Sequence, residues 1–565
     1  MSGMGRTLTL ALAVALASVP GPGASARSLA SLGYTVLRWL DRAEIVRHDL
    51  SVEVDPAGLT ARFADDVTFV SAGAGDLYVL LGADAVLERV SGPEGQDVAF
   101  SRAYGWLSLP FAVYRIASPG IERGREFSLR FEWHVTPGTV RFVNPFVALH
   151  FFHLGFDALW YPHMPGEQFF HADVRVTVPA GYRAIADGEL VGRETVDGGA
   201  RERFHFRTPV PVMGMGLAVG RFREAAAIEA APGAVIEAWA PVGWISSVDR
   251  AARDAAAALG FFQEKLGPLP VERFYVAELP FPGGASYPSL YGLAYGGDLS
   301  FLEPPDETRW DSDLILAYLV AHETAHKWLG GMVGTPVVGS AWLSEGLADY
   351  LAYLALAAMK GEETSASLLY AKAYRPYVEG ARGRPRALSA VELFDDDRDV
   401  LYQKGTLVFR MLHRRLGDEA FFALIRSFIH HHAGRVVTGQ EFIDFADAFV
   451  REAGAAGAAG VHEPAGLRAF FDQWIKGTQT LDYALQVLEA GEAHLAFRVV
   501  SRGRLVEPGQ VPVEVQLENG ARLVQWAGLD ETVTLELPAR PVLARLDPDH
   551  WLADADPANN VWQAP

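Results

Sequence analysis

Cysteine is absent from the 565-residue chain, and this absence excludes two kinds of site. Without thiols the fold cannot depend on disulfide bonds, and thiolate-bound copper(I) or iron–sulfur centres have no ligands. Basic charge is also scarce, because 49 Lys and Arg residues face 69 Asp and Glu residues, for a net charge of −20. Such an acidic chain argues against binding to nucleic acids or to anionic membranes.

Long apolar runs are missing after the N-terminus, so we expect no transmembrane segment in the mature chain. The N-terminus itself has the features of a secretory signal. Arg6 supplies positive charge, an apolar run extends over 8–19, and Ala24-Ser25-Ala26 offers a cleavage site. We predict a signal peptide at 1–26 and export to the periplasm or the extracellular space. An uncleaved membrane anchor is the alternative.

The strongest signal in the chain is an H-E-x-x-H pattern formed by His322, Glu323 and His326. On a helix, residues four apart lie on one face, so both imidazoles can reach a single ion. The adjacent Glu323 can then act as general base on a metal-activated water. Apolar residues on both sides favour a helix, and Gly330-Gly331 would end it.

A third metal ligand follows in residues 342–350, WLSEGLADY. Here Glu345 completes a His, His, Glu set, which is one of the known ligand sets of catalytic zinc. We expect Ser344 to cap this second helix and to place Glu345 in its first turn. The structural alternative is two buried histidines beside a surface glutamate.

These two segments resemble the gluzincin signature of the aminopeptidase N family, which also includes leukotriene-hydrolase-type enzymes. Residues 400–405, VLYQKG, are similar to the Tyr-x-Lys-Gly segment of that family. The resemblance implies a zinc metallopeptidase that holds one Zn²⁺ per chain on the three ligands, with Glu323 as base. It also implies that Tyr402 stabilises the oxyanion of the tetrahedral intermediate. A core tyrosine that opens an amphipathic helix is the structural alternative.

One motif departs from the family pattern. Where related aminopeptidases carry Gly-x-Met-Glu-Asn, whose glutamate binds the free α-amine of the substrate, this chain has Gly283, Gly284, Ala285 and Ser286. The backbone can still pair with an extended peptide, but Ser286 cannot form a salt bridge with an ammonium. His150 and His153 fall near further amine-pocket positions, although paired histidines among aromatic residues are more often structural.

Peptides are therefore the expected substrates, and three functions stay open. An aminopeptidase-like zinc peptidase is favoured by the motifs. An endopeptidase, or a hydrolase of peptides with blocked or unusual N-termini, is the first alternative, because Ser286 replaces the amine-binding glutamate. A non-catalytic zinc-containing binding protein is the second. Oligomeric state is left open.

Periodicity indicates a multidomain α+β protein. Alternating apolar residues predict an N-terminal antiparallel β domain at 27–222, with strands at 48–54, 127–133 and 174–179. A mostly α catalytic domain, thermolysin-like by the resemblance, is expected at 223–480. Alternation returns at 485–565, which we interpret as a small C-terminal β-sandwich. With no counterpart of the large C-terminal helical domain of many relatives, the cleft is expected to be more open.

Overall fold

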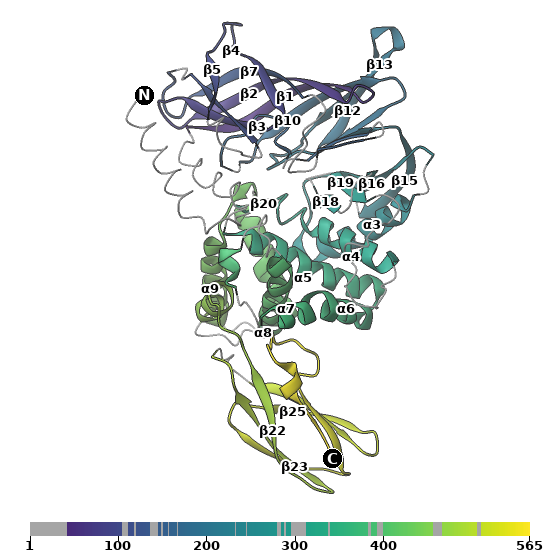
Figure 1. Ribbon diagram of the computed structural model, residues 1–565, viewed down its shortest axis with the longest axis vertical. Coiled ribbons are helices and arrows are strands. Elements are labelled where there is room, and N and C mark those ends of the chain that lie inside the picture. Colours follow the sequence, from purple (N-terminus) through teal and green to yellow (C-terminus); the bar gives the residue numbers. More distant parts are fainter. Residues whose placement is uncertain are drawn as a thin grey trace, which may run out of the picture.

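The computed structural model has three regions, an N-terminal β-rich part, a helical part and a C-terminal β part (Figure 1). The signal predicted at 1–26, Gly283 and His150 lie outside the residues that it describes. Those residues are 42–103, 111–117, 120–135, 145–148, 151–155, 158–166, 168–231, 233–243, 246–279, 284–286, 290–294, 312–336, 339–381, 386–391, 399–455, 466–504 and 510–565.

The described residues of the N-terminal part form three sheets. The first has the order β12 (Glu189–Val196), β13 (Arg201–Arg207), β10 (His171–Pro179), β1 (Ala43–Asp55), β2 (Thr60–Ser71), β7 (Glu126–Val135), β4 (Ala85–Ser91). The second has the order β11 (Arg183–Ala186), β14 (Leu217–Gly220), β9 (Phe151–Leu154), β8 (Pro145–Ala148), and the third β3 (Leu77–Gly82), β6 (Phe111–Ile116), β5 (Phe100–Ala103).

The three strands predicted from alternation lie inside β1, β7 and β10 and are confirmed. The expectation of a purely antiparallel domain is wrong in one place, because β1 and β10 pair in parallel. A parallel pair needs a long crossover connection, and strands β2 to β9 supply it. Along β1, buried and exposed residues alternate as a half-buried strand requires.

His153 places a titratable group in the core of this part. The residue is 1% exposed on β9, and burial lowers the pKa of its imidazole from 6.5 to about 4. Between these two pH values the unfolded chain binds a proton that the folded chain does not. The contribution of His153 to the free energy of unfolding is therefore fully present above pH 6.5. It is lost as the pH falls toward 4, at about 1.4 kcal/mol per pH unit.

Acid is thus expected to destabilise the chain partly through this one group. Between pH 7 and pH 4 the free energy of unfolding of the wild type decreases. In the His153→Leu variant this decrease should be smaller by about 3 kcal/mol, whatever the variant's stability at pH 7. Urea unfolding at several pH values, followed by tryptophan fluorescence, measures the slope. An identical pH dependence in the two proteins would contradict the prediction.

A central sheet joins the N-terminal part to the helices. Its order is β15 (Phe222–Ala231), β16 (Ala234–Pro241), β17 (Arg273–Leu279), β19 (Leu290–Ala294), β18 (Gly284–Ser286). On β17, Tyr275 and Ala277 belong to the N-terminal core, whereas Phe274 and Val276 belong to the helical core. At β17 both faces of the sheet are therefore buried, one against each core, which fixes the N-terminal part against the helical part.

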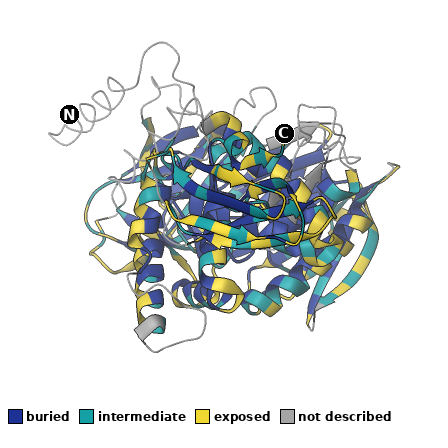
Figure 2. Cartoon of the chain, turned by 90° about the horizontal axis from the view of Figure 1, so that it is seen from below, coloured by how far each residue is buried: buried dark blue, intermediate teal, exposed yellow. Residues whose placement is uncertain are grey.

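The helical part follows the central sheet. Its helices are α3 (Val248–Leu266), α4 (Ser312–Ala325), α5 (Ala341–Lys360), α6 (Glu362–Leu369), α7 (Arg375–Ala381), α8 (Asp399–His432), α9 (Gly439–Ala455) and α10 (Arg468–Phe471), with β20 (Val333–Gly334) paired to β21 (Arg435–Val436). Within α8, Gly417 has φ +77°, so the helix is broken there. Figure 2 shows that buried residues fill the interior of the molecule while exposed residues lie on outer helix turns and strands.

Two sheets are formed by the C-terminal residues that the structure describes. One has the order β22 (Tyr483–Ala490), β23 (His494–Ser501), β26 (Thr532–Glu536), and the other β25 (Arg522–Ala527), β24 (Val511–Leu517), β27 (Pro541–Leu546), β28 (Val561–Gln563). Arg410 on α8 donates to the backbone oxygens of His550 at 2.8 Å and Asp549 at 3.0 Å. Arg414, one turn later, lies over the ring of Trp551, 4.3 Å from its centroid. These contacts attach the C-terminal sheets to α8, at the far end of the helical part from the N-terminal sheets (Figure 1).

Among the described residues, no helix combines the length and the apolar character that a bilayer crossing needs.

Candidate metal centre

Helix α4 places the two histidines of the H-E-x-x-H pattern. Every residue from Ile315 to Ala325 is buried, which is typical of a helix that is apolar on all sides. The helix ends at Ala325, but the N–H of His326 still bonds to the oxygen of His322 at 3.3 Å, so both imidazoles share a face. Gly330, with φ +124°, then turns the chain away, as the glycine pair predicted.

Helix α5 places Glu345, although not at the turn expected. The helix begins at Ala341, and the position before it is taken by Ser340. Ser344 is therefore one turn inside the helix, and the prediction that it caps α5 is wrong. The reason is that Trp342 and Leu343 are buried in the helical core, which draws the first turn four residues earlier. The Ser344 hydroxyl instead donates to the Leu329 oxygen at 3.3 Å.

The ligand atoms of His322, His326 and Glu345 converge. The two Nε2 atoms are 3.0 Å apart, and each lies 3.5 Å from Oε2 of Glu345. Tetrahedral zinc at about 2.0–2.1 Å from each ligand requires ligand atoms about 3.3 Å apart, so these residues fit the ion. Within the described part of the chain, this is the one cluster of three histidine or acidic residues close enough to hold a metal.

A second set of groups orients the imidazoles. Nδ1 of His326 lies 2.9 Å from the Leu329 oxygen, to which it can donate, so that Nε2 is left for a metal. Nδ1 of His322 lies 3.4 Å from Oδ1 of Asp349. The carboxylate of Asp349 also accepts hydrogen bonds from the hydroxyls of Tyr318 on α4 and, at 2.7 Å, Thr406 on α8.

Sequence reasoning missed Asp349, although a usable signal was present. It follows Glu345 by four residues, so both carboxylates lie on one face of α5. Tyr318 likewise precedes His322 by four residues on α4. The tertiary contact with Thr406 left no such signal, because its helix lies more than fifty residues further along the chain.

Replacing Asp349 by Asn is expected to weaken zinc binding by about 10- to 100-fold, because the group that orients His322 loses its charge. Competition with a chromogenic chelator measures the affinity. Asp254→Asn is the matched control, since Asp254 is also a buried carboxylate but pairs with Lys360 rather than with a residue of the metal centre. Equal zinc affinity in the Asp349→Asn variant and the wild type would show that Asp349 does not support the site.

The charges at the site favour a bound cation. Burial lowers the pKa of His322, but the carboxylates of Asp349 and Glu345 outweigh it and raise the pKa to about 10. Burial raises the pKa of Glu345, yet His326 and His322 hold it well below its ordinary value. The two imidazoles thus lie next to carboxylates, whose negative charge a divalent ion would balance.

Glu323 is 7% exposed, and burial raises the pKa of its carboxyl group above the usual value, as a general base near neutral pH requires.

Lys327, one turn after Glu323 and 2% exposed, was missed by sequence reasoning. Burial lowers its pKa to about 7, and the charges of Asp187 and Glu323 act in the opposite direction. Asp187 follows β11, so the N-terminal part contributes a charge to the electrostatics of the site.

Tyr402 lies in the first turn of α8, and its ring centroid is 5.9 Å from that of His322. Burial and the charge of Glu345 raise the pKa of its hydroxyl well above 10, so the group keeps its proton and can donate it in a hydrogen bond. The side chain is half-buried and reaches the metal ligands from a third helix.

The expected substrate-binding stretch lies beside the zinc helix. Gly284, Ala285 and Ser286 form β18, which pairs with β19 and contacts α4. β18 is the last strand in the order of the central sheet. Within the described residues its second edge pairs with no other strand. His153 is buried on β9, where its strand neighbours are Ala218 and Phe146.

Comparison with known proteins adds a family to this geometry. Residues 291–474 match the family described as Peptidase family M1 domain. Endoplasmic reticulum aminopeptidase 1 of Homo sapiens is 24% identical over 222 residues, covering 38% of this chain and 23% of that protein. Aminopeptidase N of Lactobacillus helveticus is 26% identical over 196 residues, covering 33% of this chain and 22% of that protein. The match thus spans about a quarter of the length of these relatives.

A similar fold occurs in solved structures. The M1 zinc metallopeptidase from Deinococcus radiodurans superposes with a TM-score of 0.58 and 20% identity, over 72% of this chain and 91% of that chain. A mutant of the same protein gives a TM-score of 0.59 and 19% identity, over 77% and 95%. The likeness extends the shared architecture, an N-terminal β-rich part followed by helices, well beyond residues 291–474.

Proposed function

We propose that this chain is a zinc-dependent metallopeptidase that hydrolyses peptide bonds in an aminopeptidase-like manner, a proposal that the match of residues 291–474 to the Peptidase family M1 domain supports. One observation carries the proposal. The ligand atoms of His322, His326 and Glu345 converge at zinc spacing beside a buried carboxyl group, Glu323, whose pKa is raised. We further propose a single zinc ion per chain, held by these three residues.

The residues around the ligands have separate tasks in the proposed reaction. When bound, zinc would supply the Lewis acid that polarises the scissile carbonyl and the attacking water. Glu323 takes a proton from that water and delivers it to the leaving amine. The hydroxyl of Tyr402 donates to the carbonyl oxygen as negative charge develops on it. The edge of β18 pairs with the substrate backbone.

The finer architecture is proposed on the same grounds. The helices that carry the site would form a thermolysin-like catalytic domain at 223–480, between a β domain at 27–222 and a C-terminal β-sandwich at 485–565. The order of the described sheets and helices supports this division. We also propose export to the periplasm or beyond, supported by the signal-like sequence at 1–26.

Ser286 favours a second candidate function. This residue stands where related aminopeptidases have the glutamate that binds the free α-amine, so the salt bridge that enforces cleavage at the N-terminus is missing. A chain with the same zinc site and no amine anchor would cut within peptides, or cut peptides with blocked ends. The two candidates share their chemistry and differ in where the substrate is held.

One experiment separates these functions. The full chain is loaded with zinc and given one peptide with a free or an acetylated N-terminus, and the fragments are identified by mass spectrometry. Stepwise loss of N-terminal residues from the free peptide alone would support the aminopeptidase. Internal cuts in both peptides would assign an endopeptidase. No cleavage of either by zinc-loaded protein would overturn peptidase activity in favour of a non-catalytic zinc-binding role.

A further inference from the structure

Helices α5 and α8 touch at a pair of glycines beside the site. A Cβ atom added to Gly346 would lie 2.7 Å from the Cα of Gly405, and one added to Gly405 would lie 2.7 Å from the Cα of Gly346. Real Cβ atoms do not approach other heavy atoms this closely. The two backbones are thus in direct contact, whereas helices that meet through side chains pack about 8–10 Å apart.

This contact lies between two functional groups. Gly346 directly follows the metal ligand Glu345, and Gly405 comes three residues after Tyr402 on α8. The oxygen of Leu401 is 3.1 Å from the position of a Cβ on Gly346, so the turn that carries Tyr402 is itself part of the contact. The next residue, Thr406, bonds to Asp349 on α5 at 2.7 Å.

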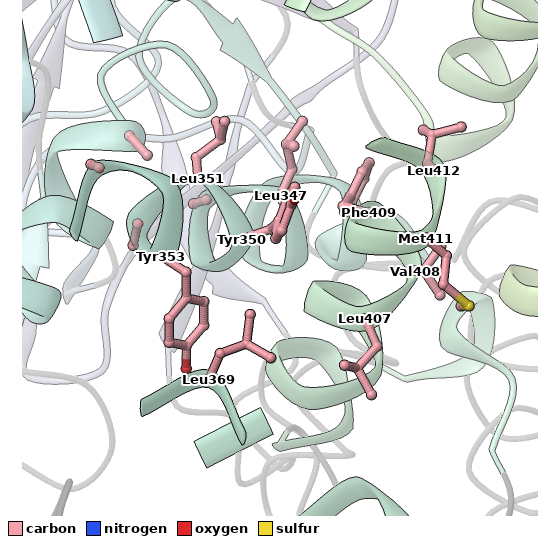
Figure 3. Close-up of a cluster of buried hydrophobic side chains, with 14 of the residues drawn as sticks. Leu347, Tyr350, Leu351, Tyr353, Leu369, Leu407, Val408, Phe409, Met411 and Leu412 are labelled. Carbon is pink, nitrogen blue, oxygen red and sulfur yellow. The ribbon is translucent and has the colours of Figure 1, made fainter. Parts of the chain in front are cut away.

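Apolar side chains on the same two helices add to the contact between Gly346 and Gly405. Leu347 and Leu351 on α5 and Leu407 and Phe409 on α8 are fully buried in one cluster (Figure 3). The two helices therefore cannot slide or separate without breaking a packed core. Glycine destabilises a helix interior relative to alanine. Here the close approach of the α5 and α8 backbones compensates for that cost.

We propose that Gly346 and Gly405 are positioning residues of the reaction, because their backbone contact sets the place of the Tyr402 hydroxyl relative to the ligand Glu345. The inference rests on the proposed peptidase function, in which Tyr402 donates to the developing oxyanion. A methyl group at position 405 moves α8 away from α5, so the Tyr402 hydroxyl no longer reaches the developing oxyanion. A misplacement of about 1 Å can cost about 100-fold in rate.

The test compares Gly405→Ala with Gly380→Ala. Gly380 lies on α7 and a Cβ there meets no atom within 4 Å, so this control adds the same methyl group in open space. We expect Gly405→Ala to keep its zinc and its KM while kcat falls about 10- to 100-fold. Gly380→Ala should leave kcat, KM and zinc content unchanged. A folded, zinc-loaded Gly405→Ala variant with wild-type kcat would overturn the proposal.

A double-mutant cycle distinguishes positioning from a general loss of structure. If Gly405 acts through Tyr402, adding Tyr402→Phe to Gly405→Ala should cost little more than either change alone. Losses that multiply would show that the two residues act independently and would refute the proposal. Gly346→Ala, which places a methyl group in the same contact from the side of α5, replaces Gly405→Ala in the cycle if that variant does not fold.

A binding measurement that needs no turnover separates the proposed peptidase function from the proposed role of the glycines. A phosphinic peptide presents tetrahedral oxygens that stand in for the intermediate, so its affinity reports the contribution of the Tyr402 hydroxyl. Gly405→Ala and Tyr402→Phe should weaken its binding by the same factor. Wild-type protein that binds the phosphinic peptide but cleaves no peptide would contradict the proposed function alone. If folded Gly405→Ala binds the phosphinic peptide as tightly as the wild type, the proposal that the two glycines position Tyr402 is contradicted.

Discussion

Replacing Glu323 by Gln is expected to leave zinc in place and to lower kcat by about 100- to 10,000-fold, the usual contribution of a general base. The amide keeps the size of the side chain but cannot accept a proton from the attacking water. Glu323 is not one of the three converging ligands, so the metal content should not change. Zinc per chain, measured by elemental analysis, and initial rates of peptide cleavage provide the two readouts.

The control for this variant is Glu345→Gln, made on the other carboxylate of the site. Its side chain lies 3.5 Å from the Nε2 atoms of both histidines, so loss of its charge should weaken zinc binding and activity together. The pair of variants therefore separates the base from the ligand. Substantial activity in Glu323→Gln with zinc bound would remove Glu323 from its role as base.

Replacing Tyr402 by Phe is expected to lower kcat by about 100- to 1,000-fold with little change in KM, the loss found when other enzymes lose one oxyanion donor. The ring stays, so the contact with His322 is kept, and only the hydroxyl that remains protonated next to Glu345 is removed. Steady-state kinetics over a range of peptide concentrations gives kcat and KM separately.

Tyr374→Phe is the matched control for Tyr402→Phe. Tyr374 is 1% exposed, and its hydroxyl makes no hydrogen bond within the described part of the chain. It packs against His550 of the C-terminal part, with ring centroids 4.8 Å apart. Loss of this hydroxyl should not change either kinetic constant. An unchanged kcat in Tyr402→Phe, by contrast, would exclude Tyr402 from the stabilisation of the oxyanion.

Two of the three residues of the metal centre could be predicted from helical spacing, because His322 and His326 are four apart. Glu345 followed instead from the known His, His, Glu ligand set of catalytic zinc. Alternation located β1, β7 and β10, since a half-buried strand repeats every two residues. The resemblance of residues 400–405 to a known motif pointed to Tyr402, which periodicity could not have placed.

What the sequence did not reveal depends on contacts between distant segments. The parallel pairing of β1 with β10, the link from Asp349 to Thr406 and the contact of Gly346 with Gly405 each join residues that no local pattern connects. The start of α5 was misplaced because Trp342 and Leu343 pack into the core, so tertiary packing placed Ser340 rather than Ser344 before the first turn. Local patterns therefore identified the metal-ligand residues but not the contacts between helices that position them.

The attachment of the C-terminal sheets to α8 bears on how the protein can be engineered. Arg410 and Arg414 lie on the same unbroken half of α8 as Tyr402, ahead of the interruption at Gly417. A truncated protein that ends before β22 would leave the guanidinium of Arg410 without its two backbone acceptors. It would also loosen the helix that carries Tyr402. A shortened form of the protein should therefore retain the C-terminal strands.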